Sequence, residues 1–241
     1  MNAWWIALQF LTRLPVSLSA MPEPQQVGRS LLFYPAVGLL IGGLLWAVQA
    51  LTEGAPLLLQ GALILTLWVA VTGALHLDGL ADSADAWVGG LGDVERTLRI
   101  MKDPASGPIA VVSLVLLLLL KFAAIVAILD AGHGVYLLLA PWLARVLLPL
   151  LLLITPYLRA GGLGAALVEY MPHTALRRVI GLNLLAVLLF GWTGGMVLMV
   201  GLGVFFYLRR LMLQRLGGCT GDTAGALVEI SECAIVLTLA L

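Results

Sequence analysis

The chain has 241 residues, of which 61% are hydrophobic and only 11% are charged. A soluble domain has roughly half apolar and a quarter charged residues, so this composition excludes an ordinary water-soluble fold. The 13 basic and 13 acidic residues cancel, and a net charge of zero gives no general attraction to nucleic acid.

Long apolar stretches follow one another along the chain. A membrane helix needs about 20 apolar residues, and lipid offers the backbone no hydrogen-bond partners, so each span must be a helix or part of a closed barrel. Residues 114–120 show none of the alternation of a barrel strand. The sequence therefore predicts an all-α, polytopic transmembrane bundle, with one integral membrane domain over residues 1–241. The expected helices, about seven, cover residues 31–51, 57–75, 109–129, 135–154, 179–191, 194–208 and 224–241.

The first residues are amphipathic. Trp4, Leu8 and Leu11 share one helical face beside Trp5, as in a helix that lies among lipid headgroups. Residues 1–14 are therefore expected to form an interfacial helix. Packing of this helix against the bundle is an equally good interpretation.

Basic residues mark every second connection between the expected helices. The connections at 52–56, 130–134 and 192–193 contain no Lys or Arg. By the positive-inside rule, the amino terminus and the longer loops are expected in the cytoplasm and the carboxyl terminus outside. The basic residues before the first helix and in the marked connections are Arg13, Arg29, Arg96, Arg99, Lys102, Arg159, Arg177, Arg178, Arg209, Arg210 and Arg215.

Residues 76–107 hold a first acidic motif and the loop that follows it. If the second helix continues into this segment, Asp78, Asp82 and Asp85 share about a sixth of the helix circumference. Such carboxylates repel one another unless a cation neutralises them, and oxygen ligands alone suit Mg²⁺, Mn²⁺ or Ca²⁺ rather than zinc. A solvated acidic face is the alternative. His76 points to nearly the opposite side, where packing or support of the site are both open.

Residues 217–232 hold a second acidic motif. Asp222 and Glu229 are seven residues apart and share a face, with Glu232 about 60° further round and deeper in the bilayer. Thr220 or Asp222 would cap the helix behind glycines that could cradle a phosphate. Close helix packing is the alternative role of these glycines.

Two further basic residues, Lys121 and Arg145, lie in the middle of apolar spans. A charge at the centre of a lone membrane helix costs about 2.5 to 3.5 kcal/mol, so both should face a polar interior with a partner. They are candidates for function, and a structural salt bridge to a carboxylate of the last helix is the alternative.

The end of the second helix and the start of the seventh are expected on the same side of the membrane. The two acidic motifs can therefore form one site, beside the basic loop that contains Lys102. Carboxylates for a metal, together with cations for phosphate oxygens, are the groups that phosphoryl transfer requires.

Several segments also resemble motifs of the bacterial cobalamin synthase family, the adenosylcobinamide-GDP ribazoletransferases. The two acidic segments are highly specific in combination, and the others extend the resemblance over nearly the whole chain. The matching positions are residues 10–16 (FLTRLPV), 76–85 (HLDGLADSAD), 99–103 (RIMKD) with Gly107, Tyr157 with Arg159 and residues 162–164, and 221–232 (GDTAGALVEISE).

This resemblance implies transfer of cobinamide phosphate from adenosylcobinamide-GDP to α-ribazole or its 5′-phosphate, with release of GMP, at the end of cobalamin biosynthesis. The expected cofactor is Mg²⁺, with Asp222 beside the three carboxylates of the first motif, Asp78, Asp82 and Asp85. Asp222 or Glu229 would serve as base. The groups that would steady the diphosphate are Lys102, Lys121, Arg145 and Arg159. Further substrate-binding candidates are His76, Asp103, Thr220 and Glu232.

The expected partners are the corrinoid nucleotide, α-ribazole or its phosphate, and membrane lipid, with no nucleic acid; a homo-oligomer is compatible with this interpretation. The expected location is the bacterial inner membrane, with the site facing the cytoplasm. One rival is a CDP-alcohol phosphotransferase, but its D-x-x-D-G-x-x-A-R signature is absent around Asp78. A metal or corrinoid transporter, which would also use intramembrane carboxylates, is the rival from another class.

Overall fold

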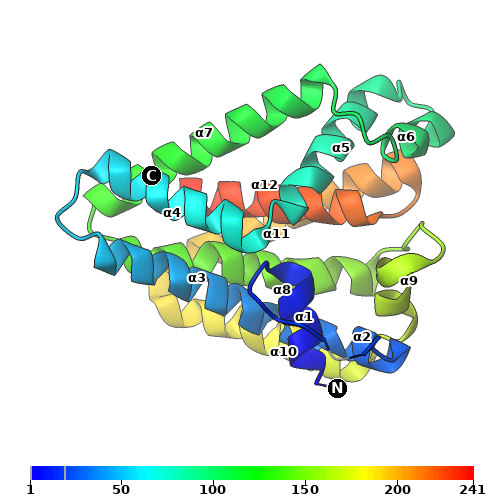
Figure 1. Ribbon diagram of the computed structural model, residues 1–241, viewed down its shortest axis with the longest axis horizontal. Helices are drawn as coiled ribbons and strands as arrows, with labels where there is room; N and C mark the ends of the chain where they lie inside the picture. Colours follow the sequence, from blue (N-terminus) through cyan, green and yellow to red (C-terminus); the bar gives the residue numbers. More distant parts are fainter. Residues whose placement is uncertain (1, 19) are drawn as a thin grey trace.

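The computed structural model describes residues 2–18 and 20–241, apart from the side chains of residues 162 and 163, which belong to the motif at 162–164. Every regular element in these residues is helical (Figure 1). The elements are α1 (Ala3–Leu11), α2 (Pro24–Ser30), η1 (Leu31–Phe33), α3 (Tyr34–Leu51), α4 (Leu57–Thr72), α5 (Leu75–Gly89), α6 (Val94–Ile100), α7 (Pro108–Asp130), η2 (Gly134–Leu138), α8 (Leu139–Ile154), α9 (Gly162–Glu169), α10 (His173–Val187), η3 (Leu188–Phe190), α11 (Gly191–Leu216) and α12 (Gly221–Ala240).

Within the described residues, five helical stretches are long and apolar enough to cross a membrane, and a sixth span results if the bent pair α4 and α5 is counted as one. The prediction of a polytopic helical bundle is confirmed. The five stretches are Pro24–Leu51, Pro108–Asp130, Gly134–Ile154, His173–Leu216 and Gly221–Ala240.

The stretch His173–Leu216 contains two of the predicted segments, because it doubles back between α10 and α11. The Phe190 ring packs against Trp142 near the start of α8, and Gly191 then takes a positive φ of 62°. Further along α11, the Nε of Arg209 donates to Thr155 Oγ1 (3.0 Å), just after the end of α8. Both α10 and α11 therefore run along α8 (Figure 1).

The second predicted helix does not continue straight into the first acidic motif. The chain bends by 86° between α4 and α5. Gly73 and Ala74 both adopt left-handed φ values, 61° and 57°, which end the helical hydrogen bonding. The residues before α2 cross this break, where the backbone N–H of Arg13 donates to Val71 O (2.7 Å). The first acidic motif consequently lies on a separate helix, α5.

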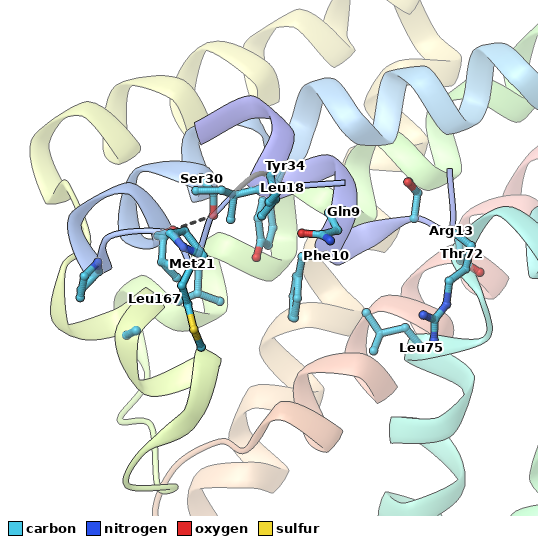
Figure 2. Close-up of a pocket in the computed structure, with 16 residues that line it drawn as sticks. Gln9, Phe10, Arg13, Leu18, Met21, Ser30, Tyr34, Thr72, Leu75 and Leu167 are labelled. Carbon is cyan, nitrogen blue, oxygen red and sulfur yellow. Dashed lines mark hydrogen bonds between the residues drawn. The ribbon is translucent and has the colours of Figure 1, made fainter. Parts of the chain in front are cut away.

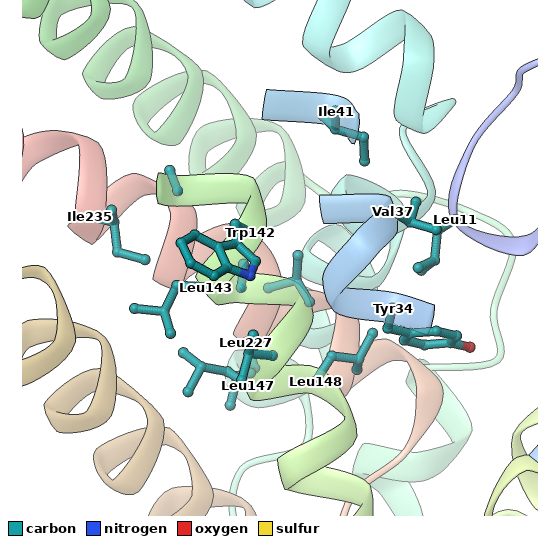
Figure 3. Packing of buried hydrophobic residues seen from close by; sticks show 14 of the residues in the cluster. Leu11, Tyr34, Val37, Ile41, Trp142, Leu143, Leu147, Leu148, Leu227 and Ile235 are labelled. Atoms are coloured by element: carbon teal, nitrogen blue, oxygen red, sulfur yellow. The ribbon is translucent and has the colours of Figure 1, made fainter. Parts of the chain in front are cut away.

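The core lies between α3, α8 and α12, whose apolar side chains interdigitate (Figure 3). Two glycines of α3 let the backbones approach closely: a Cβ on Gly38 would lie 2.5 Å from Pro141 O, and one on Gly42 would lie 2.7 Å from the Cα of Leu138. Helix α1 packs against this bundle by burying Leu8 and Leu11, and its Trp5 remains 44% exposed.

The basic connections gather at one end of the bundle. This end carries α1, α2, α5, α6 and α9, and the carboxyl terminus lies at the other end (Figure 1). Contacts between distant elements join the basic end: Arg215 Nη2 donates to Trp87 O of α5 (3.0 Å), and Arg209 Nη2 donates to Ile154 O of α8 (2.7 Å). The alternation of basic loops in the sequence therefore corresponds to the two ends of the molecule.

Candidate functional site

The two acidic motifs meet where α5 crosses α12. A Cβ on Gly79 would lie 2.8 Å from the carbonyl oxygen of Asp222 and 3.0 Å from its Cα, so the two backbones touch at this point. One turn deeper, Gly225 packs against His76, whose Cα would be 3.3 Å from an added Cβ. In both contacts a glycine of one motif lies against the backbone of the other, and Asp78 and Asp222 consequently line the same cavity.

We expect Gly79→Ala to separate the two motifs. The new methyl group cannot fit against the Asp222 backbone without a shift of α5 or α12, which should lower the free energy of unfolding by about 1–3 kcal/mol. Thermal unfolding of the detergent-solubilised protein measures this loss. Gly43→Ala on α3 is the matched control, because nothing lies within 4 Å of its added Cβ. Equal stability of the two variants would contradict the close crossing.

The carboxylates at this crossing act on one another. Asp82 experiences the negative charges of Asp78, Asp222 and Asp85, and the positive charge of Arg159. Arg159 Nη2 donates to Asp222 Oδ2 at 2.5 Å. Among the described residues, neither Asp78 nor Asp82 has an ion-pair partner. The crossing therefore carries an excess of negative charge with a single arginine against it.

Arg159 reaches Asp222 because the loop after α8 pairs with the loop before α12. The N–H of Leu158 donates to Cys219 O (2.9 Å), and the N–H of Cys219 donates to Pro156 O (2.8 Å). Burial raises the pKa of the Cys219 thiol to about 12, so this cysteine has a packing role. The pairing holds a basic side chain beside the start of α12.

Helix α12 begins at a cap that the sequence partly predicted. Thr220 is the cap, and its Oγ1 accepts from the N–H of Thr223 (3.2 Å). Thr223 returns the bond, since its Oγ1 accepts from the N–H of Thr220 (2.9 Å). Asp222 is thereby left in the first turn without a capping role, and its carboxylate faces Arg159.

Asp85 has a role that the sequence did not reveal. Its carboxylate accepts two backbone N–H bonds at the start of α7, from Gly107 (2.5 Å, Oδ2) and Ala110 (3.0 Å, Oδ1). This interaction ties the acidic helix to the loop after α6 and favours the negative charge at a helix amino terminus. Each oxygen of Asp85 already accepts a hydrogen bond, whereas Asp78 and Asp82 make no such bond among the described residues.

A polar cavity of about 630 Å³ opens beside the crossing. Its walls include Lys102, Arg159 and Tyr157. Burial raises the pKa of the Tyr157 hydroxyl despite the opposing charge of Arg159, so Tyr157 is protonated and can donate a hydrogen bond. Asp103, a substrate-binding candidate, lies next to Lys102 in an exposed turn, where its Oδ1 accepts from the N–H of Ala105 (3.0 Å).

A second cavity, of about 180 Å³, lies over the crossing itself. Its walls include His76, Asp78, Gly79 and Asp222, and it shares Tyr157 with the polar cavity. Tyr157 therefore lies between the polar cavity, which Lys102 and Arg159 line, and this second cavity. Because Asp78 and Asp222 line it, we call the second space the acidic cavity.

A third cavity, of about 670 Å³, lies under α1 and between α2 and α9 (Figure 2). Its lining is predominantly apolar. Four residues belong to both this cavity and the acidic one, so the two spaces share a wall. These residues are Phe10, Tyr34, Leu75 and Leu167.

The four intramembrane charges form one buried cluster. Lys121 Nζ binds Glu229 Oε2 (3.0 Å) and Glu232 Oε2 (2.6 Å), and Arg145 Nη1 pairs with Glu232 Oε1. Lys121 also lies 4.0 Å from the ring centroid of Trp68. The expectation that these carboxylates meet Lys121 and Arg145 is met, in the form of the salt-bridge alternative.

His76 links this buried cluster to the acidic cavity. Its Nδ1 lies 3.4 Å from Arg145 Nη2, its side chain is buried, and the residue also lines the cavity that contains Asp78 and Asp222. The buried cluster lies next to the crossing and not within it. Glu229 therefore binds Lys121 and does not lie beside Asp222.

The residues at the crossing fit a hard divalent cation. Oxygen donors with uncompensated charge are the ligands that Mg²⁺ prefers, and Mg²⁺ commonly takes one or two carboxylates and completes its coordination with water and phosphate. Among the described residues, no three His, Cys, Asp or Glu side chains stand close enough to hold a metal by themselves. A cation held by these carboxylates would need water or phosphate oxygens to complete its coordination.

A family model described as cobalamin-5-phosphate synthase matches residues 3–240. The chain belongs to the cobalamin-5-phosphate synthase family. Proteins named adenosylcobinamide-GDP ribazoletransferase from Ectopseudomonas mendocina, Pseudomonas aeruginosa PAO1 and Pseudomonas fluorescens Pf-5 are 64%, 62% and 59% identical to it. The alignments cover 98%, 98% and 100% of this chain and 97%, 96% and 100% of those proteins. The comparison with solved structures found no match.

For this cobalamin-5-phosphate synthase family member, the sequence motifs correspond to connected parts of one region. The two acidic segments form the crossing, and the Tyr157–Arg159 segment joins it to the polar cavity. Sequence reasoning left out three side chains of this region that belong to no motif: Tyr34, Leu75 and Leu167. Only their position in the shared wall singles them out.

Proposed function

We propose that this chain transfers adenosylcobinamide phosphate from adenosylcobinamide-GDP to α-ribazole or its 5′-phosphate, with release of GMP, in a Mg²⁺-dependent reaction at the α5–α12 crossing. Membership in the family supports the activity, since relatives that carry this name align over nearly their full length. The observation that carries the site is the contact of Gly79 with the Asp222 backbone, which places both acidic motifs beside Arg159.

The chemistry needs groups for two phosphates and one hydroxyl. A ribose hydroxyl of α-ribazole attacks the phosphorus that bears cobinamide, a new O–P bond forms, and the O–P bond to GMP breaks. The proton of that hydroxyl passes to a carboxylate, for which Asp222 and Asp82 are the candidates at the crossing. Glu229 is a weaker candidate, because it belongs to the buried cluster and lines neither the polar cavity nor the cavity over the crossing.

The charges are arranged to suit this transfer. Asp78, Asp82 and Asp222 would hold Mg²⁺, which when bound supplies positive charge for the diphosphate oxygens. Lys102 and Arg159, in the polar cavity, donate to the phosphate of the departing GMP and stabilise its growing negative charge. The hydrogen bonds between the loop after α8 and the loop before α12 hold Arg159 in place. Arg159 and the carboxylates therefore keep their relative positions.

The same proposal includes a location in the bacterial inner membrane, with the basic end of the bundle in the cytoplasm. Its support is the gathering of the basic connections at one end, which the positive-inside rule places inside. The site lies at that end, where a nucleotide substrate is available.

We expect the purified full-length chain to release GMP only when adenosylcobinamide-GDP, α-ribazole and Mg²⁺ are all present. Chelation with EDTA should lower the rate by at least about 100-fold, and added Mg²⁺ should restore it, because the carboxylates alone repel the diphosphate. Quantifying GMP by liquid chromatography measures this. Release of CMP from a CDP-alcohol would favour the rival phosphotransferase, and corrinoid uptake into vesicles without GMP release would favour a transporter.

A further inference from the structure

The apolar cavity lies at the basic end of the bundle, and the transfer of phosphate does not account for it. Its volume, about 670 Å³, lies in the range of small-molecule sites. Figure 2 shows Met21 and Leu167 on one side, Arg13, Thr72 and Leu75 on the other, and the rings of Phe10 and Tyr34 between them. Leu75 opens α5, so this cavity ends one helical turn before Asp78.

One hydroxyl in the lining is unsatisfied. Three of the lining hydroxyls donate to carbonyl groups of their own segments: Thr12 to Leu8 O (2.7 Å), Ser30 to Val27 O (2.6 Å) and Thr72 to Trp68 O (3.0 Å). Among the described residues, the hydroxyl of Tyr34 makes no hydrogen bond of normal geometry, although the residue is 0% exposed.

A buried hydroxyl without a partner is costly, and such a group in a cavity wall is typical of a donor that meets a ligand. The Tyr34 ring is fixed by stacking on Phe10, with centroids 6.2 Å apart. Tyr34 lines both the apolar cavity and the acidic cavity. A molecule that accepts its hydrogen bond can therefore extend from the apolar space toward Asp78 and Asp222.

We propose that this cavity binds the dimethylbenzimidazole base of α-ribazole, with Tyr34 donating to the free ring nitrogen. The inference rests on the proposed function, which supplies the acceptor. The base is a flat aromatic bicycle with two methyl groups and a single hydrogen-bond acceptor. These features match a mostly apolar wall that presents the Tyr34 hydroxyl as a donor, and the ribose then lies toward the shared wall and the carboxylates.

The other parts of the substrates fit this cavity poorly. Guanine carries several donors and acceptors that apolar walls would leave unpaired. The corrin ring carries amide side chains around its edge, with the same consequence. The diphosphate of the donor needs the cations of the polar cavity, Lys102 and Arg159. The acceptor base is the one part of the substrates that apolar walls favour.

The test compares KM values for the two substrates, measured with the full-length chain in lipid nanodiscs. Tyr34→Phe should raise KM for α-ribazole by about 3- to 10-fold, as expected for one hydrogen bond, and leave KM for adenosylcobinamide-GDP unchanged. Its thermal midpoint should not fall, because the lost hydroxyl makes no hydrogen bond of normal geometry to the described residues. Tyr136→Phe, at the opposite end of the bundle, is the matched control and should change neither KM.

A second variant and a second substrate test the shape of the cavity. Ala166→Leu fills the apolar cavity without reaching the acidic one, since Ala166 lines only the former. It should raise KM for α-ribazole by about 10-fold or more, and the riboside of unmethylated benzimidazole should show a similar loss with the wild-type chain.

Failure of this inference is distinguishable from failure of the proposed function. If the wild-type chain makes no product from the two substrates, the proposed function is wrong. If product forms and Tyr34→Phe leaves KM for α-ribazole unchanged, the cavity binds something else. A phospholipid that survives purification and that α-ribazole does not displace, detected by mass spectrometry, would instead assign the cavity to an acyl chain and overturn the inference.

Discussion

Replacement of Asp82 by asparagine is expected to lower the rate of GMP release by at least about 100-fold. Asp82 experiences the negative charges of Asp78, Asp222 and Asp85, so its carboxylate belongs to the group that would hold a cation. Asparagine keeps the shape of the side chain and removes the charge. Steady-state GMP release in membranes at matched protein level measures the effect.

The same variant should fold at least as well as the wild type. Removing one of several mutually repelling carboxylates relieves repulsion, so the thermal midpoint should stay equal or rise. Asp130→Asn at the opposite end of the bundle is the control, because Asp130 is exposed and far from the crossing. Near-normal activity of Asp82→Asn would reject the metal assignment for this residue.

The sequence predicted the bundle because hydrophobic length is a local property. Each apolar stretch can be recognised without knowledge of its neighbours. The bend between α4 and α5 was missed because its cause is not local: Gly73 is followed by Ala74, a residue that rarely adopts a positive φ, and the crossing of the Arg13 segment accompanies the break. Helical periodicity still holds within α5. Asp78 and Asp82 therefore share one face of a helix, as predicted, although this helix is α5 and not a straight continuation of α4.

The parts of the candidate site that the sequence did not show depend on contacts between distant segments. The spacing in the sequence predicts Asp85 as a third metal ligand. In the structure its oxygens accept N–H bonds from Gly107 and Ala110, which are more than 20 residues away along the chain. From the sequence alone, Tyr34 is an ordinary aromatic residue of the core. Its hydroxyl becomes informative only when the other hydroxyls of the cavity wall, those of Thr12, Ser30 and Thr72, are known to donate to backbone carbonyls.

The buried cluster gives the second large expected effect. Glu232 accepts from both Lys121 and Arg145 and is 0% exposed, so Glu232→Gln leaves two buried cations with one carboxylate between them. Loss of one member of a buried ion pair costs about 3–5 kcal/mol, a large share of the stability of a typical protein. The expected result is a strongly lowered thermal midpoint or loss of folded protein from the membrane.

A charge-balanced pair of changes separates this structural role from catalysis. Lys121→Met alone and Glu229→Gln alone each leave one uncompensated charge, so each should destabilise the protein. The double variant removes one charge of each sign and keeps the Arg145–Glu232 pair, so its stability should recover most of the loss. If Glu229 only neutralises Lys121, the double variant also recovers GMP release. A stable double variant without activity would instead show that Glu229 or Lys121 takes part in the reaction, and the cluster would then belong to the chemistry.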